Sequence, residues 1–143
     1  MTQPTTALPG FGAALLIPLG RIVLASLYIL GGLNKIVDPG PTIAAMGEVG
    51  LPVPALLVFA VIGVELGFGL VVATGGALAG GRWVPAAALL LVVHTIAINL
   101  MIHDFWTDGD ATVLSLFFKN VAVAGGLTLV AGLYARWAQD LGR

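Results

Sequence analysis

Four ionisable side chains lie inside long apolar stretches of the sequence, where a charge has little water to hydrate it. Glu65 has eleven residues of apolar sequence before it and ten after it, and His94 is similarly central in its own stretch. Arg21 and Lys119 stand nearer the ends of theirs. A carboxylate that is shielded from water can take up and release protons at useful pKa values. These residues are therefore the first candidates for proton transfer or for binding a polar ligand.

The composition indicates a membrane protein. Of the 143 residues, 59% are hydrophobic and 9% are charged, whereas soluble domains carry about 25% charged residues. Too few polar side chains remain to cover a soluble fold, so the expected partner is the lipid bilayer. The net charge is -1 and no basic run is present, so nucleic acid is not expected as a partner. The absence of cysteine excludes thiolate catalysis, iron–sulfur ligation and covalent haem attachment.

Four segments are long and apolar enough to be spanning helices, which need about 20 residues each. Their approximate ranges are 13–36, 54–75, 83–102 and 113–134. None of them shows the alternation of barrel strands. The expected fold is thus an all-α integral membrane four-helix bundle, formed by one domain over residues 13–136. Residues 1–12 are expected to form a flexible tail, 137–143 a short tail, and 42–50 a short helix at the outer surface.

The charges of the loops predict the direction of insertion. Arg82 stands between the second and third spans, and Arg136 and Arg143 follow the fourth. The loop between the third and fourth spans carries three aspartates and no lysine or arginine. The positive-inside rule therefore places both termini in the cytoplasm.

A lone charge at the centre of a bilayer costs roughly 2.5–3.5 kcal/mol, so such groups usually face the bundle interior and find partners. Estimated depths place Arg21 in the inner third, Glu65 in the middle and Lys119 in the outer third. We therefore predict an interior polar chain of Arg21, Glu65, His94 and Lys119. Two alternatives stay open: an ion pair that only fixes helix register, and a Lys119 side chain that snorkels outward. Asn120 favours the inward position, since it also needs a polar neighbour.

Two patterns of small residues predict close approach of helices. Gly63 and Gly67 form a GxxxG pattern around Glu65, and Ala122 and Gly126 form a second pair in the fourth span. Such spacing lets another backbone come near. We expect helix contacts at both places.

The motif HDFW closes the third span. Trp106 suits the headgroup level, where an amphipathic ring is favoured. His103 and Asp104 are expected to hydrogen-bond to Lys35, Lys119 or Asn34 on the same side of the membrane. The alternative is that the motif is an interfacial anchor and a helix cap.

The two histidines are poorly spaced for a metal. His94 and His103 are nine residues apart, about 13 Å along a helix, so they cannot share one metal ion directly. The two axial ligands of a b-type haem normally come from separate helices. We therefore expect no intrinsic haem or metal.

Several of these motifs together resemble the DoxX family of small four-span membrane proteins. They are RIVLASLYILGGLNKIVDP in the first span, Glu65 after GLPVP, HDFW, and FFKNVAVAGGL in the fourth span. The resemblance covers roughly residues 20–133. It implies a four-helix bundle in a bacterial inner membrane, and family names refer to a quinol oxidase or a thiosulfate:quinone oxidoreductase subunit. The matching positions are Arg21, Lys35, Glu65, His103, Asp104, Trp106, Lys119 and Asn120.

Three functions follow as hypotheses. The first is a subunit of a quinone-linked redox complex, with quinone as its possible cofactor and a protein partner as the source of electrons, because the chain has no evident electron carrier. The second is a non-catalytic scaffold for a soluble redox enzyme, and the third is a small-molecule transporter, for which a homodimer would suffice. Whether the chain is itself an oxidoreductase stays open. The candidate catalytic residues are Glu65, His94 and Lys119, and the candidate binding residues are Arg21, Lys35, His103, Asp104, Trp106 and Asn120.

Overall fold

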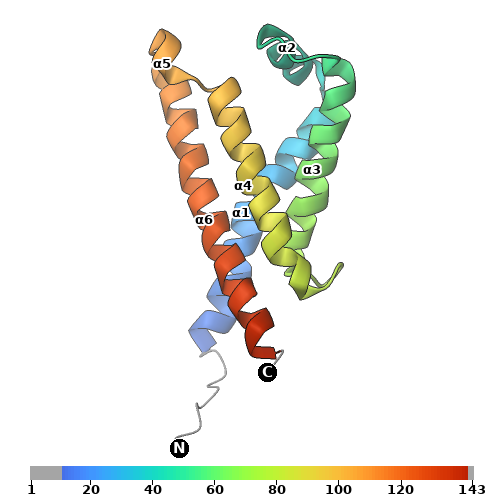
Figure 1. The fold of residues 1–143 in the computed structure, drawn as a ribbon, viewed down its shortest axis with the longest axis vertical. Helices are drawn as coiled ribbons and strands as arrows, with labels where there is room; N and C mark the ends of the chain where they lie inside the picture. The colour runs from blue at the N-terminus through green and yellow to red at the C-terminus, as the bar shows by residue number, and fades with distance from the viewer. Residues whose placement is uncertain (1–10, 142–143) are drawn as a thin grey trace, which may run out of the picture.

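The computed structural model describes residues 11–141, and over that range it is built of helices without strands (Figure 1). Four helices are long and apolar enough to cross a membrane, which confirms the predicted all-helical membrane fold. They are α1 (Phe11–Val37), α3 (Pro54–Thr74), α4 (Val84–Met101) and α6 (Ala111–Leu141). Three short elements lie between them: α2 (Gly40–Glu48), the 3₁₀ turn η1 (Gly81–Trp83) and α5 (Phe105–Asp108).

Proline and glycine explain most of the helix boundaries. Pro41 stands in the first turn of α2 and Pro54 in that of α3, where the missing proline N–H has no helical partner to lose. Gly75 ends α3 with φ 65°, a left-handed cap that glycine adopts without strain. The short helix predicted at 42–50 is present as α2, which begins two residues earlier.

The predicted tails differ from the structure where they overlap it. The first long helix already begins at Phe11, and α6 continues to Leu141 beyond the predicted domain end at residue 136. The remaining parts of the two predicted tails, residues 1–10 and 142–143, lie outside the described residues.

The bundle consists of two helix pairs. α1 packs along α3, α4 packs along α6, and α3 and α4 join the pairs (Figure 1). The pairs diverge toward the end that carries α2 and α5, which we call the α2 end. The apolar core lies toward the opposite end, the terminal end, and consists of Ala25, Tyr28, Val72, Ala87, Ala88, Leu91, Leu127 and Ala131.

Glycines bring helices close at Gly32, which was not predicted, and at Gly126 of the predicted Ala122/Gly126 pair. A Cβ atom on Gly32 would lie 2.8 Å from Cγ of Leu66, so α1 and α3 approach closely there. A Cβ atom on Gly126 would likewise lie 2.9 Å from Leu24. By contrast, a Cβ atom on Gly63 or Gly67 would meet nothing within 4 Å. The predicted GxxxG contact around Glu65 is therefore absent among the described residues, whereas the contact predicted at Ala122 and Gly126 is present at Gly126.

Candidate functional site

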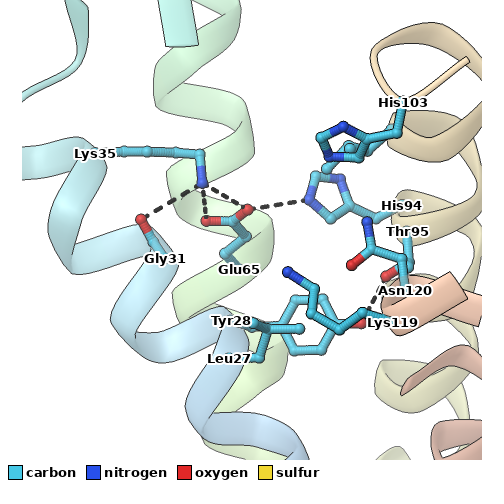
Figure 2. Close-up of a pocket in the computed structure, with 11 residues that line it drawn as sticks. Leu27, Tyr28, Gly31, Lys35, Glu65, His94, Thr95, His103, Lys119 and Asn120 are labelled. Carbon is cyan, nitrogen blue, oxygen red and sulfur yellow. Dashed lines mark hydrogen bonds and ion pairs between the residues drawn. The ribbon is translucent and has the colours of Figure 1, made fainter. Parts of the chain in front are cut away.

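Glu65 lies at the middle of α3 and faces the interior of the bundle, where it is 5% exposed. Its carboxylate accepts hydrogen bonds from Nζ of Lys35, at 3.0 Å to Oε1 and 2.9 Å to Oε2. Nε2 of His94 on α4 lies 3.3 Å from Oε1 (Figure 2). An ionised Glu65 requires this Nε2 atom to carry a hydrogen, because a carboxylate only accepts. The cluster thus joins α1, α3 and α4 through one carboxylate.

A glycine on α1 makes room for this ion pair. Gly31 stands one turn before Lys35, and a Cβ atom there would lie 3.3 Å from Oε2 of Glu65. The Lys35 ammonium also lies 3.5 Å from the carbonyl oxygen of Gly31. Because the carboxylate is almost fully buried, it needs these donors to offset its lost hydration. The sequence GGLNK therefore supplies both the space and the counter-charge.

A cavity of about 200 Å³ opens beside the ion pair. Side chains of α1, α3, α4 and α6 converge on it, with Lys35 and Glu65 on one side and Lys119 and Asn120 on the other (Figure 2). At about 30 Å³ for each water molecule, its volume corresponds to about seven waters. The residues that line it are Leu27, Tyr28, Gly31, Lys35, Glu65, His94, Thr95, Ile98, His103, Lys119 and Asn120.

Two hydroxyl groups that the sequence analysis did not single out form one wall of the cavity. The hydroxyl of Tyr28 lies 2.6 Å from Oγ1 of Thr95, and Thr95 donates to the carbonyl oxygen of Leu91 at 2.8 Å. Since the Thr95 hydroxyl has a single hydrogen, Tyr28 is the donor in the first bond. This bond connects α1 to α4 just below the charged cluster.

A pair of asparagines joins α4 to α6. Nδ2 of Asn120 donates to Oδ1 of Asn99 at 2.8 Å, and Nδ2 of Asn99 donates to the carbonyl oxygen of Phe117 at 3.0 Å. Asn120 lines the cavity as a predicted binding residue, but one of its amide hydrogens is already engaged. Asn99 was missed, although its spacing of four residues from Thr95 places both polar groups on one face of an apolar helix.

His103 and Lys119 lie at the α2 end of the cavity. The pKa of His103 is lowered from its ordinary value of 6.5, first by burial and second by the positive charge of Lys119. His103 is therefore neutral at neutral pH and offers one donor and one acceptor. Lys119 lines the cavity and is also exposed. It therefore combines the inward-facing and the outward-reaching positions that were considered from the sequence.

Three predicted site residues lie outside this cavity. Asp104 precedes α5 and accepts a hydrogen bond from the Thr107 hydroxyl of that helix at 2.7 Å. Trp106 is 56% exposed and packs edge-on against Phe117, with ring centroids 5.8 Å apart. The exposure of Trp106 agrees with the interfacial anchor considered for HDFW. The predicted bonds from Asp104 to Lys35 or Lys119 are absent among the described residues.

The prediction that Arg21 joins the polar chain of Glu65 is wrong. Its guanidinium lies beside Gly75 and the ring of Tyr134, at the terminal end of the bundle. Gly75 is ten residues beyond Glu65 along α3, about 15 Å of helix. An arginine side chain cannot cover that distance, so Lys35 holds the place next to the carboxylate.

A second cavity, of about 260 Å³, adjoins the first under α2. The two share Lys35, Ile98 and His103. The remaining lining is mainly apolar and comes from α2, α3 and the end of α4: Pro41, Thr42, Ala45, Met46, Val61 and Ile102. The polar cavity is thus continued toward the α2 end by an apolar one.

The donor set suits an oxygen-rich ligand better than a metal ion. No group of three or more His, Cys, Asp or Glu side chains within residues 11–141 is placed to hold a metal. Two ammonium groups, a neutral imidazole and an amide surround the cavity instead. Such groups donate hydrogen bonds to carbonyl or anionic oxygens.

Comparisons with known proteins agree with the resemblance noted from the motifs. The family model DoxX matches residues 15–104. The chain is also 27% identical over 126 residues to the inner membrane protein YphA of Escherichia coli strain K12, an alignment that covers 85% of this chain and 86% of YphA. No solved structure matches the chain.

Proposed function

The chain belongs to the DoxX family, and on that premise we propose that it is a membrane subunit of a quinone-linked redox complex. The observation that carries the proposal is the carboxylate of Glu65, held between Lys35 and His94 at the wall of a cavity lined by further hydrogen-bond donors. A carboxylate at the wall of a polar cavity is placed within reach of a bound ligand, as a group that transfers protons must be.

The cavity offers suitable partners for the two carbonyl oxygens of a quinone ring. Lys119 is the donor on the α6 side, and His103 and Asn120 are the other polar groups near it. The adjoining cavity under α2 offers an apolar path for the isoprenoid chain, because its lining is mainly aliphatic. The size of the polar cavity fits a ring or a headgroup rather than a whole drug-sized ligand, for which pockets of roughly 300–1,000 Å³ are usual.

The proton chemistry assigned to this site is simple. Reduction of a quinone to a quinol takes up two electrons and two protons. Glu65 and His94 would each take up a proton from solvent and pass it to a ring oxygen, and Lys35 would hold the carboxylate in place. The electrons would come from a partner protein, with which this chain forms the complex.

The membrane setting is part of the proposal. YphA is an inner membrane protein, and four apolar helices make this chain a multi-pass membrane protein. We place it in a bacterial inner membrane with both termini in the cytoplasm, following the loop charges. The cavity would then open in the half of the bilayer away from the cytoplasm.

A direct binding experiment tests the proposal. Detergent-purified full-length protein is extracted for co-purifying quinone and then titrated with a short-chain quinone. We expect binding by the wild type, and about tenfold or greater weakening in Lys119→Met, because a hydrogen bond from a charged donor contributes ~1.5–3 kcal/mol. The matched control is Lys119→Arg, which keeps a charged donor.

The role of Glu65 has its own test. In the reconstituted complex, Glu65→Gln keeps the shape of the side chain but removes its proton chemistry. We expect it to lower quinone-dependent turnover by orders of magnitude, while Glu48→Gln, an exposed carboxylate on α2, leaves turnover unchanged. Full turnover by Glu65→Gln would rule out a proton role.

A non-catalytic scaffold is the second candidate, and the Lys35–Glu65 bond itself favours it. A buried ion pair can have a purely structural role, in which it holds two helices in register. In that case no quinone binds, Glu65→Gln weakens the bundle, and the partner enzyme still co-purifies with the folded variant.

A further inference from the structure

Arg21 carries a buried guanidinium that lacks a hydrogen-bond acceptor. The residue is 8% exposed. Over residues 11–141, neither Nε nor Nη1 has a hydrogen-bond partner, although both atoms are buried. A guanidinium has five N–H donors and stays charged at any ordinary pH. Buried polar groups are normally paired, so this one requires an explanation.

The surroundings tolerate the charge but do not accept its hydrogens. The guanidinium fills the space that a side chain would need at Gly75, whose φ of 65° also favours glycine. Its carbon lies 5.4 Å from the ring centroid of Tyr134, close enough for a cation–π contact. The carboxyl end of α3 lies at the same place and presents the negative end of its dipole. Nε and Nη1 therefore keep hydrogens without an acceptor among the described residues.

Among the charged side chains that the structure describes, those at the terminal end of the bundle are arginines. Arg82 and Arg136 are exposed there. The carboxylates whose side chains the structure describes all lie elsewhere, at the level of Glu65 or at the α2 end: Asp38, Glu48, Glu65, Asp104 and Asp110. Trp83 and Trp137 stand at this end as well, as expected for the level of lipid headgroups.

We propose that Arg21 binds a phosphate group at the terminal end of the bundle, at a site separate from the cavity of Glu65. A planar guanidinium matches a phosphate with two parallel hydrogen bonds. The Tyr134 hydroxyl lies at the same spot, 2.7 Å from where a Cβ atom of Gly75 would be, and adds one further donor. The phosphate is the phosphodiester of an anionic phospholipid or free inorganic phosphate, which present the same oxygens.

The test compares lipids and phosphate on delipidated, full-length protein in detergent. Native mass spectrometry compares the retention of phosphatidylglycerol with that of phosphatidylcholine of equal chain length. A thermal melt then measures Tm with each lipid, and with sodium phosphate or sodium chloride at equal ionic strength. We expect the wild type to prefer phosphatidylglycerol, and Arg21→Gln to bind it about tenfold more weakly, the loss of one charge-assisted hydrogen bond. Arg82→Gln, which removes an exposed charge at the same end, keeps the preference.

Each possible result either supports phosphate binding at Arg21 or overturns it. Inorganic phosphate could raise Tm as much as phosphatidylglycerol does, with the rise lost in Arg21→Gln. That result assigns the site to free phosphate. Equal retention of both lipids by the wild type, with no effect of phosphate on Tm, overturns the proposal without any variant. An undiminished preference in Arg21→Gln also overturns it. If that variant does not fold, Arg21→Lys keeps the charge, loses the planar fork, and is expected to bind more weakly.

Discussion

Nζ of Lys35 bridges both carboxylate oxygens of Glu65, at 3.0 and 2.9 Å, and so connects the end of α1 to the middle of α3 inside the bundle. The lysine side chain is 19% exposed and the glutamate side chain 6%, so the bond forms largely away from solvent. Electrostatic attraction is stronger in such a setting, and so is the cost of losing one partner.

Removal of both partners should therefore cost less than the sum of the two single removals. We expect Lys35→Met to lower the free energy of unfolding by about 3 kcal/mol, because Glu65 is left buried and unpaired. The double variant Lys35→Met/Glu65→Met should be clearly less destabilised than the sum of the single variants. Chemical denaturation in mixed micelles measures all three, with Glu48→Met as a surface control. Strictly additive effects would show that the bond contributes nothing to stability.

Gly32 of α1 should tolerate substitution less than Gly67 of α3. Gly32→Ala places a Cβ atom 2.8 Å from Cγ of Leu66, and the resulting overpacking should cost about 1–3 kcal/mol. Gly67→Ala meets nothing within 4 Å and should be neutral or stabilising by up to about 1 kcal/mol, since alanine favours helix. Melting temperatures of the two variants provide the comparison, and a reversed order would contradict the helix contact described here.

The stability of the protein should depend on pH through His103. Its pKa in the folded protein lies below the ordinary 6.5, so the folded chain holds fewer protons at this residue than the unfolded chain between those two values. Its contribution to the free energy of unfolding therefore falls as pH is lowered from 6.5 through the folded pKa, and it is fully present above 6.5. NMR titration of the imidazole measures the pKa directly.

Lys119 provides the control for this titration. Lys119→Met removes the nearby positive charge, so the pKa of His103 should rise toward 6.5. The part of the lowering that comes from burial should remain. A pKa that does not respond to Lys119→Met would mean that the two side chains are not close.

The orientation in the membrane can be tested because the chain contains no cysteine. Glu48→Cys on α2 and Ala79→Cys in the loop after α3 each introduce one exposed thiol. The positive-inside rule predicts that a membrane-impermeant maleimide labels Glu48→Cys in intact spheroplasts and labels Ala79→Cys only after lysis. The opposite pattern would place the termini outside.

The spans could be predicted from sequence because hydrocarbon thickness fixes their length. An apolar run of about 20 residues has few alternatives to a spanning helix. The interior position of Glu65 followed from the same reasoning, since a short carboxylate in the middle of such a run reaches neither interface. Proline and glycine added the boundaries of α2 and α3.

The pairing could not be predicted from depth alone. Residue counting put Lys35 at the membrane surface and Arg21 inside, so Arg21 was taken as a partner for Glu65. Lys35 has a long, flexible side chain that reaches back along α1 past Gly31, and depth estimates ignore that reach. The packing of the two helix pairs decides which face of each helix points into the bundle. The sequence of one helix alone does not specify that packing.

The side-chain contacts between helices differ in their response to acid. Tyr28 and Thr95 connect α1 to α4 by hydroxyls, and Asn99 and Asn120 connect α4 to α6 by amides. None of these four groups changes its charge across mildly acidic pH. The connections from α1 to α4 and from α4 to α6 should therefore hold while His103 takes up its proton at the end of α4. Mild acid should then disturb the α2 end of the bundle and leave the middle of these three helices joined.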